Sequence, residues 1–294
     1  MPDAVTFIHA PKCGGTSVGS ALRARYIYSQ ATISLEESTA MRRLLWPEAE
    51  LTWDDGDLLP SALVRKGEGR TAWLDQVRRL DLLLVSHADN DHAGGASTII
   101  NSPLASGSIN YTPLNGCEHG KTVEWEQLRI LFLWPKAGNQ EDSNAQSCVV
   151  KITDGEQSVL IPGDIERSSE YALLTLLKQT NKHNSYKQDL EADLLIAPHH
   201  GSKTSSTNAF IRAVNPKAVV FTQGYLNRWR FPAKEVQERY RNKRVLQLKT
   251  SYHGYIQATF HFNNHSGVTN AKPDSFKLES YRKDLHKRWF IPAR

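Results

Sequence analysis

The most constraining feature of this sequence is a short apolar run that ends directly in a cluster of histidines and aspartates. Residues 82–85 (Leu-Leu-Leu-Val) are typical of a buried strand. His87, Asp89, Asp91 and His92 follow at once. Neutral imidazole and carboxylate groups are the ligands that divalent Zn, Mn or Mg takes in proteins. We therefore expect a strand that positions a metal site, in preference to a solvated acidic loop.

The spacing of these residues suggests how they point. Side chains alternate across an extended backbone, so His87, Asp89 and Asp91 would lean to one side of the segment. His92 would then open the next element of the chain.

Length and composition are those of a globular protein. The chain has 294 residues, 39% hydrophobic and 23% charged, enough for one large core or two modest ones. It contains no apolar run of bilayer length and no signal-peptide pattern, so we expect a cytoplasmic location for the free chain. The formal net charge of +5 is compatible with a phosphate-rich partner.

The cysteines point to no cross-link. Cys13, Cys117 and Cys148 are odd in number and far apart in the chain. We expect neither a disulfide framework nor a cysteine-based zinc cluster.

Two further strands end in polar residues. A hairpin of residues 147–152 and 157–161 leads to Asp164, and a strand at residues 193–197 leads to His199 and His200. Alternating strands and helices with polar residues at the strand ends indicate a layered α/β domain.

Three motifs now stand together: H-A-D-N-D-H at residues 87–92, P-G-D-I-E at 162–166 and P-H-H-G-S-K-T-S-S at 198–206. They resemble the metallo-β-lactamase superfamily, and more narrowly the C-terminal hydrolase-like domain of the ComEC family of DNA-internalisation competence proteins. The resemblance covers roughly residues 70–262. It implies an αββα sandwich that holds two divalent metal ions (Zn, Mn or Mg) at one edge.

The resemblance also implies seven candidate ligands: His87 and Asp89 for the first metal, Asp91, His92 and His200 for the second, Asp164 as a bridge between them, and His199 as the alternative to His200. Asp91 and Asp164 would be catalytic. Asp91 would orient a water that the two metals activate for attack on phosphorus.

Two positions depart from the superfamily pattern. Histidine usually stands where this chain has Asp89, and a further histidine usually lies near Asn144. Oxygen ligands make the first site harder, so Mn or Mg fits it as well as Zn.

Two segments are candidates for substrate contact. Ser202, Lys203 and Thr204 could bind phosphate oxygens, or residues 202–206 could simply cap a helix. Asn227, Arg228 and Trp229 belong to a basic, aromatic loop that could grip single-stranded DNA. In the alternative interpretation, Trp229 and Phe231 are core residues and the arginines are solvated.

The N-terminus suggests a different family. Residues 5–17 read as a strand and a glycine loop with Lys12, and a helix would follow from Thr16 through Tyr26. The segment resembles the 5′-phosphate loop of sulfotransferases that use PAPS, or it is a remnant without a nucleotide.

We therefore divide the chain into three parts: a sulfotransferase-like strand-loop-helix segment (residues 1–45), a metallo-β-lactamase-like domain (46–264) and a basic C-terminal tail (265–294). The strands that normally open the domain are not evident before residue 82. We expect an incomplete N-terminal half of the sandwich.

The function expected from these motifs is metal-dependent hydrolysis of phosphodiesters in nucleic acid, such as single-stranded DNA. Because family members are membrane-associated, a membrane DNA-uptake channel is a candidate partner. One alternative is an accessory nucleic-acid-binding module of DNA uptake with a weak or inactive metal site. Another is a PAPS-dependent sulfotransferase fragment.

Overall fold

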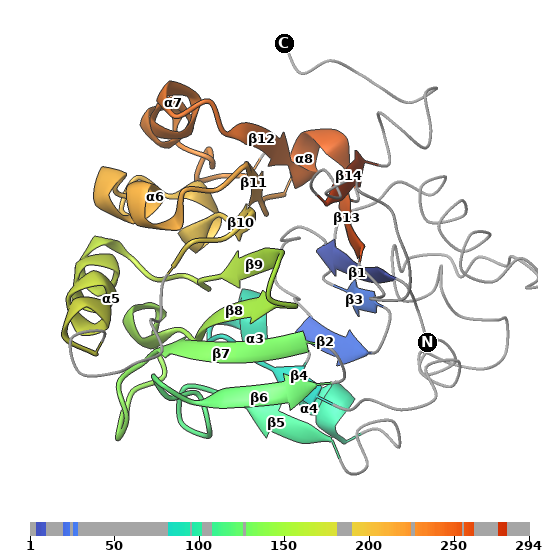
Figure 1. The fold of residues 1–294 in the computed structure, drawn as a ribbon, viewed down its shortest axis with the longest axis vertical. Coiled ribbons are helices and arrows are strands. Elements are labelled where there is room, and N and C mark those ends of the chain that lie inside the picture. Colours follow the sequence, from blue (N-terminus) through green and yellow to red (C-terminus); the bar gives the residue numbers. More distant parts are fainter. Residues whose placement is uncertain are drawn as a thin grey trace, which may run out of the picture.

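The computed structural model describes residues 4–9, 20–23, 26–28, 82–94, 96–101, 108–125, 128–180, 190–224, 227–254, 256–261 and 276–280. Within these ranges the strands form two mixed sheets that lie one against the other (Figure 1).

The first sheet has the strand order β14-β13-β1-β3-β2-β4-β5. Its strands are β1 (Ala4–His9), β2 (Ser20–Arg23), β3 (Tyr26–Tyr28), β4 (Leu82–Leu84), β5 (Ile109–Tyr111), β13 (Ile256–His261) and β14 (Lys277–Ser280).

The second sheet has the order β12-β11-β10-β9-β8-β7-β6. Its strands are β6 (Thr122–Trp125), β7 (Leu128–Trp134), β8 (Val149–Thr153), β9 (Ser158–Ile161), β10 (Leu194–Ile196), β11 (Ala218–Phe221) and β12 (Leu246–Lys249). Strands β6 to β9 pair antiparallel, and β9 to β12 pair parallel.

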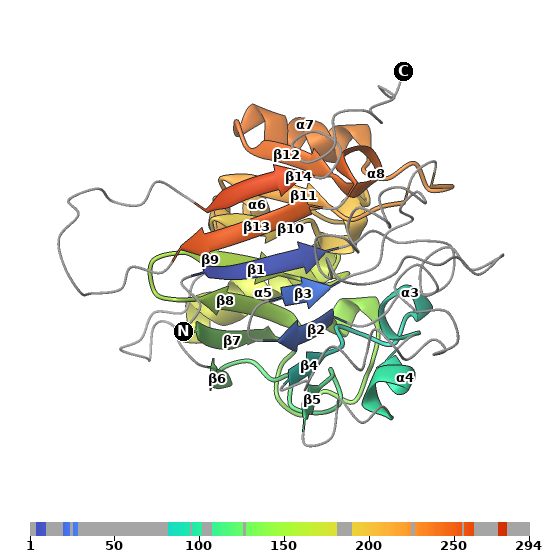
Figure 2. The same cartoon turned by 90° about the vertical axis from the view of Figure 1, so that its right-hand side faces the viewer.

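Helices complete the layers. The helices α5 (Arg167–Thr180), α6 (Asn208–Val214) and α7 (Lys234–Asn242) cover the outer face of the second sheet (Figure 1). The short helices α3 (Asn90–Ala93) and α4 (Ala96–Ile100) lie beside β4 and β5 (Figure 2). None of the helices in the described ranges is long and apolar enough to cross a bilayer. The αββα sandwich expected from the motifs is confirmed.

Alternation along the second sheet divides the core in two. In β11, Ala218 and Val220 face the first sheet, whereas Val219 and Phe221 pack under the helices. Leu194 and Leu195 of β10 divide in the same way. Because both faces are buried, these strands read as continuous apolar runs without polar alternation.

The N-terminal expectation needs correction. The structure places strands at Ser20–Arg23 and Tyr26–Tyr28, where we expected a helix. β2 pairs antiparallel with β3 and β4, and β3 pairs parallel with β1, so sheet pairing overrides the local helix signal. Three strands, β1 to β3, therefore precede β4 and the ligand motif that follows it among the described residues. The glycine loop at residues 10–19 lies outside the described residues.

The ends of the chain meet in the first sheet. β1 pairs antiparallel with β13, and β13 pairs with β14, which lies inside the range expected to be a basic tail. The division of the chain at residues 45 and 264 remains a prediction.

The cysteine expectation is wrong. Cys117 and Cys148 form a disulfide, with 5.8 Å between their Cα atoms and a sequence separation of 31. Cys148 directly precedes β8 and Cys117 lies in the loop before β6, so the fold joins two positions that spacing alone does not connect.

Candidate metal centre

Three strand ends from the two sheets deliver the candidate ligands to one place. His87 follows β4 of the first sheet, Asp164 follows β9 of the second, and His200 follows β10. The turn before Asp164 depends on Gly163, whose φ is +60°. A Cβ atom there would lie 2.7 Å from Cβ of Ser147, so only glycine fits without displacing that residue.

Asp164 lies between two imidazoles. Its Oδ1 is 3.2 Å from Nε2 of His92, and its Oδ2 is 3.3 Å from Nε2 of His200. The two Nε2 atoms are themselves 3.2 Å apart. Asp164 and His200 are buried, so this contact is shielded from solvent.

The potential ligand atoms form two overlapping groups, each within 4.8 Å: His87, His92 and Asp164 in one, and Asp91, His92 and His200 in the other. His92 is common to both groups. The second group contains the three residues expected for the second metal. The first contains His87 and Asp164 with His92, and Asp89 belongs to neither group.

Asp89 and Asp91 are placed differently from the expected alternation. Asp91 lies on α3, with its Oδ2 3.6 Å from Nε2 of His200. Asp89 precedes that helix, and its side chain is 56% exposed, with Oδ2 3.7 Å from Nε2 of His87. The helix begins at Asn90, so the backbone is not extended through Asp91, and alternation does not apply there.

The two histidines of the doublet have different neighbours. His200 points to Asp164, His92 and Asp91, whereas Nδ1 of His199 lies 3.0 Å from Oε1 of Glu166. Nε2 of His199 is 3.9 Å from Asp164. Both histidines have a positive φ, 47° for His199 and 54° for His200, in a backbone region that residues other than glycine seldom occupy. Such strain costs about 1–3 kcal/mol per residue and is concentrated at functional sites.

Hydroxyl groups orient the histidines from behind. Oγ of Ser86 lies 3.0 Å from Nδ1 of His92 and 3.1 Å from Nδ1 of His87. Oγ1 of Thr222, at the end of β11, lies 2.9 Å from Nδ1 of His200. In each imidazole the Nδ1 atom is thus engaged, which leaves Nε2 as the ligand atom that faces the cluster.

Burial and neighbouring charges shift the pKa values of His87 and Asp164 in the directions that favour cation binding. Burial and then the neighbouring His92 lower the pKa of His87 to about 4, so its imidazole is neutral at pH 7. Burial raises the pKa of Asp164, but His200 and His92 outweigh it and hold that pKa well below its usual value. Neutral imidazole and ionised carboxylate are the forms that bind a metal.

The donor set fits divalent ions. Nε2 of His87 is buried and makes no hydrogen bond within the described part of the chain. Buried polar atoms without a partner are uncommon in native proteins, and an ion is one of the explanations for them. Imidazole nitrogens suit Zn and carboxylate oxygens suit Mn or Mg, so the mixed set is compatible with all three.

Two of the three candidate phosphate-binding residues already contact other side chains of the protein. Ser202 is buried, and its Oγ lies 3.0 Å from Oγ1 of Thr204. Thr204 donates to Oε1 of Glu166 at 2.9 Å. Lys203 is exposed. The helix cap is elsewhere, since Thr207 accepts from the backbone N–H of Phe210 at the start of α6.

Asn227 stabilises the conformation of the basic, aromatic loop. Its side chain donates to the carbonyls of Gly224 and Phe231 and accepts from the N–H of Phe231, and it thereby closes the loop on itself. Trp229 is 47% exposed and stacks on Phe231, so it is not a core residue. The guanidinium of Arg228 lies 4.2 Å from the centroid of the Trp229 ring.

Three site residues escape sequence reasoning: Ser86, Glu166 and Thr222. Ser86 directly precedes the first motif and Glu166 is the last residue of the second, and these positions are a usable signal. Thr222 only ends an apolar strand, and no sequence pattern connects it to the histidine 22 residues earlier.

Comparison with known proteins identifies relatives of this chain. A family model described as the metallo-beta-lactamase superfamily matches residues 52–222. The uncharacterized protein YcaI of Escherichia coli is 32% identical over 216 residues, which are 71% of this chain and 25% of that protein. Competence protein ComA of Neisseria gonorrhoeae is 32% identical over 186 residues, 62% of this chain and 25% of that protein.

Recombination protein 2 of Haemophilus influenzae is 33% identical over 190 residues, which are 62% of this chain and 22% of that protein. The chain thus spans about a quarter of the length of the curated relatives that it matches.

Proposed function

This chain belongs to the metallo-beta-lactamase superfamily, with relatives among the competence proteins, and we propose that it is a metal-dependent phosphodiesterase that cleaves nucleic acid. The observation that carries the proposal is the convergence of His87, His92, His200, Asp91 and Asp164 in two overlapping ligand groups. The names of two relatives, a competence protein and a recombination protein, support nucleic acid as the substrate.

His87, Asp89, Asp91, His92, Asp164 and His200 would hold two divalent ions, with Asp164 presenting one carboxylate oxygen to each side of the centre. Ions bound there would polarise a phosphodiester and make water acidic enough to serve as a nucleophile near neutral pH. Zn, Mn and Mg are all compatible with this mixed donor set.

The protein's own groups would position the reactants. Asp91, which faces His200 from α3, would accept a hydrogen bond from the attacking water and fix its direction. His199, held by Glu166, and the exposed Lys203 would contact the phosphate oxygens and stabilise the charge that develops on them.

We also propose that this domain acts beside a membrane DNA-uptake channel, on a single strand of DNA. The disulfide argues against the expected cytoplasmic location, because disulfides persist mainly in oxidising compartments.

The test is hydrolysis of single-stranded DNA by the purified chain with Mn or Zn, compared with the Asp91→Asn variant. We expect the wild type to cleave the DNA and a chelator to stop the cleavage. The Asp91→Asn variant should cleave about a hundredfold or more slowly, as expected for the loss of a positioned proton-transfer group. Glu235→Gln, an exposed carboxylate on α7, is the matched control and should keep full activity.

Metal-dependent binding of DNA without cleavage in the wild type would instead favour the accessory module with an inactive site. Equal activity of Asp91→Asn and the wild type would contradict the assigned role of Asp91.

A further inference from the structure

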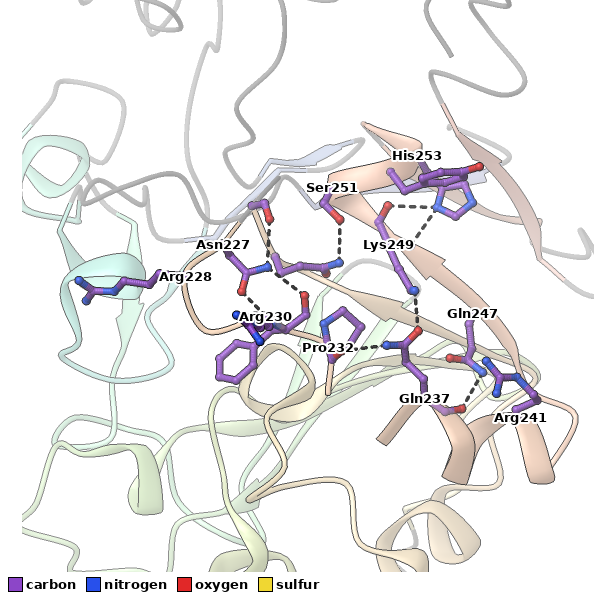
Figure 3. A pocket seen from close by; sticks show the side chains of 14 residues that line it. Asn227, Arg228, Arg230, Pro232, Gln237, Arg241, Gln247, Lys249, Ser251 and His253 are labelled. Atoms are coloured by element: carbon purple, nitrogen blue, oxygen red, sulfur yellow. Dashed lines mark hydrogen bonds between the residues drawn. The ribbon is translucent and has the colours of Figure 1, made fainter. Parts of the chain in front are cut away.

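A second candidate site lies next to the metal centre. A pocket of about 1000 Å³ opens between the loop residues 223–224 and 227–232, α7, β12 and the short helix α8 (Thr250–His253), as Figure 3 shows. Four of its lining residues are permanently or usually cationic: Arg228, Arg230, Arg241 and Lys249. The described lining residues include no carboxylate.

Arg241 and Lys249 line the side of this pocket formed by α7 and β12. Lys249 is half-buried, and its ammonium group donates to Oε1 of Gln237. Burial and then the charge of Arg241 lower the pKa of Lys249. Within the described part of the chain, neither residue forms an ion pair with a carboxylate. Two cations held near each other without a counter-ion favour an anionic ligand.

Arg239 provides the contrast. It lies two residues before Arg241 on α7, but its guanidinium donates to the carbonyls of Ser205 and Ser206 and serves the fold. Arg241 makes no such hydrogen bond to the described residues, and it extends beside Gln247 at the pocket wall (Figure 3).

Neutral groups hold this wall in place. Gln237 donates its amide to the carbonyl of Pro232, and Gln247 donates its amide to the carbonyl of Gln237. Lys249 is fixed by the same Gln237, so α7, β12 and the loop form one connected surface (Figure 3). A surface that is fixed before binding loses less entropy when a ligand is bound.

The pocket borders the metal centre through two loop residues. The ring of Phe231 lies 5.9 Å from that of His199, centroid to centroid. A Cβ atom on Gly201 would lie 2.6 Å from Cβ of Pro232, so the loop packs directly on the turn that carries the histidine doublet. A ligand that occupies the metal centre could therefore continue into the pocket.

We infer that this pocket binds a backbone phosphate of a single nucleic-acid strand at a nucleotide other than the one cleaved, with Arg241 and Lys249 as its main contacts. The inference rests on the proposed function, since it extends the substrate from the metal centre. Guanidinium and ammonium groups are the usual partners of phosphate, and nonspecific grooves for single strands combine such cations with exposed aromatic rings. Trp229, exposed beside the pocket-lining Arg228 and Arg230, supplies the ring.

The experiment measures binding of a fluorescent oligothymidine of about twelve nucleotides, the scale of one single-strand site, by anisotropy in the presence of a chelator. The variant is Arg241→Gln with Lys249→Gln. We expect about tenfold weaker binding, with a salt slope smaller by about 0.7 for one lost phosphate contact. Arg241→Gln alone, at an exposed position, should show a smaller loss and keeps the test valid if the double variant does not fold.

The matched control is Lys178→Gln with Arg212→Gln, which removes the same charge from exposed positions on α5 and α6. Unchanged oligonucleotide affinity in the pocket variants, or an equal loss in the control, would overturn the inference. A third outcome would also overturn it. In that outcome, inorganic phosphate raises the melting temperature of the wild type but not of the pocket variant, and the two proteins bind the oligonucleotide with the same affinity. The pocket would then bind the free anion.

A second readout separates this inference from the proposed function. Hydrolysis of bis(4-nitrophenyl) phosphate with Mn, a diester without further phosphates, should be unchanged in the pocket variant, and a loss there would overturn the inference. If the wild type itself hydrolysed no diester, the proposed function would fail, and the binding measurement would still decide whether the pocket holds a strand.

Discussion

Nε2 of His92 lies 3.2 Å from Nε2 of His200, although 108 residues separate the two histidines in the chain. One comes from the helix after β4 of the first sheet, and the other from the turn after β10 of the second. Asp164 contacts both, so the two sheets meet at one carboxylate. The candidate metal centre therefore depends on the whole sandwich and on no single segment.

Thr222 should act as a positioning residue for His200. Thr222→Val keeps the shape of a buried side chain but removes the hydroxyl that contacts Nδ1 of His200. We expect metal affinity to fall about ten- to a hundredfold, as for other partners that orient a ligand. Calorimetric titration with Zn measures it, and Thr222→Ser should restore most of the affinity. Wild-type affinity in Thr222→Val would show that the hydroxyl has no part in metal binding.

The two histidines of the doublet should separate on mutation. His200→Ala removes an imidazole from the centre of the cluster, and we expect about half of the bound metal to be lost. His199→Ala should keep the metal and lose activity, because His199 faces Glu166 and lies 3.9 Å from Asp164. Metal content by mass spectrometry, together with the rate of DNA cleavage, distinguishes the two. The reverse pattern would make His199 the ligand.

The disulfide should stabilise the domain. It closes a loop of 31 residues, for which chain entropy predicts a contribution of about 3–4 kcal/mol to the free energy of unfolding. Cys148 also donates its backbone N–H to the carbonyl of Ser86, next to the first ligand motif. Urea unfolding of Cys117→Ala with Cys148→Ala should show the loss, and reductant should reproduce it in the wild type. A variant as stable as the wild type would contradict this.

Acid should destabilise the metal-free protein partly through His87. Its pKa falls from 6.5 to about 4 on folding, so between these values the unfolded chain binds the additional proton. Stability is therefore complete above pH 6.5 and is lost as the pH falls toward 4, by up to about 3 kcal/mol. Urea unfolding in chelator across this range measures the slope, and His87→Gln should flatten it. An identical slope in that variant would exclude His87 as the source.

The sequence predicts the ligand motifs and the layered fold because both are local patterns. The apolar run before His87 and the hairpin before Asp164 are legible from residue type and spacing alone. Strand pairing determines what local patterns do not. β2 and β3 form because they pair with β4 and β1, and Cys117 contacts Cys148 because β8 lies beside β7.

The direction of side chains is the other limit of sequence reasoning. Asp91 departs from alternation because a helix begins at Asn90, and His199 and His200 face different neighbours from a left-handed backbone. The spacing of the motif predicts neither the start of that helix nor those two dihedral angles.

The most direct test of the account is the metal content of the protein, purified without added metal and then titrated with Zn or Mn, for the wild type and for Asp164→Ala. We predict about two ions per chain in the wild type and fewer than about one in the variant, because Asp164 would serve both ions. A wild-type chain that binds neither ion at micromolar concentration, or an Asp164→Ala variant that binds as much as the wild type, would contradict the central claim.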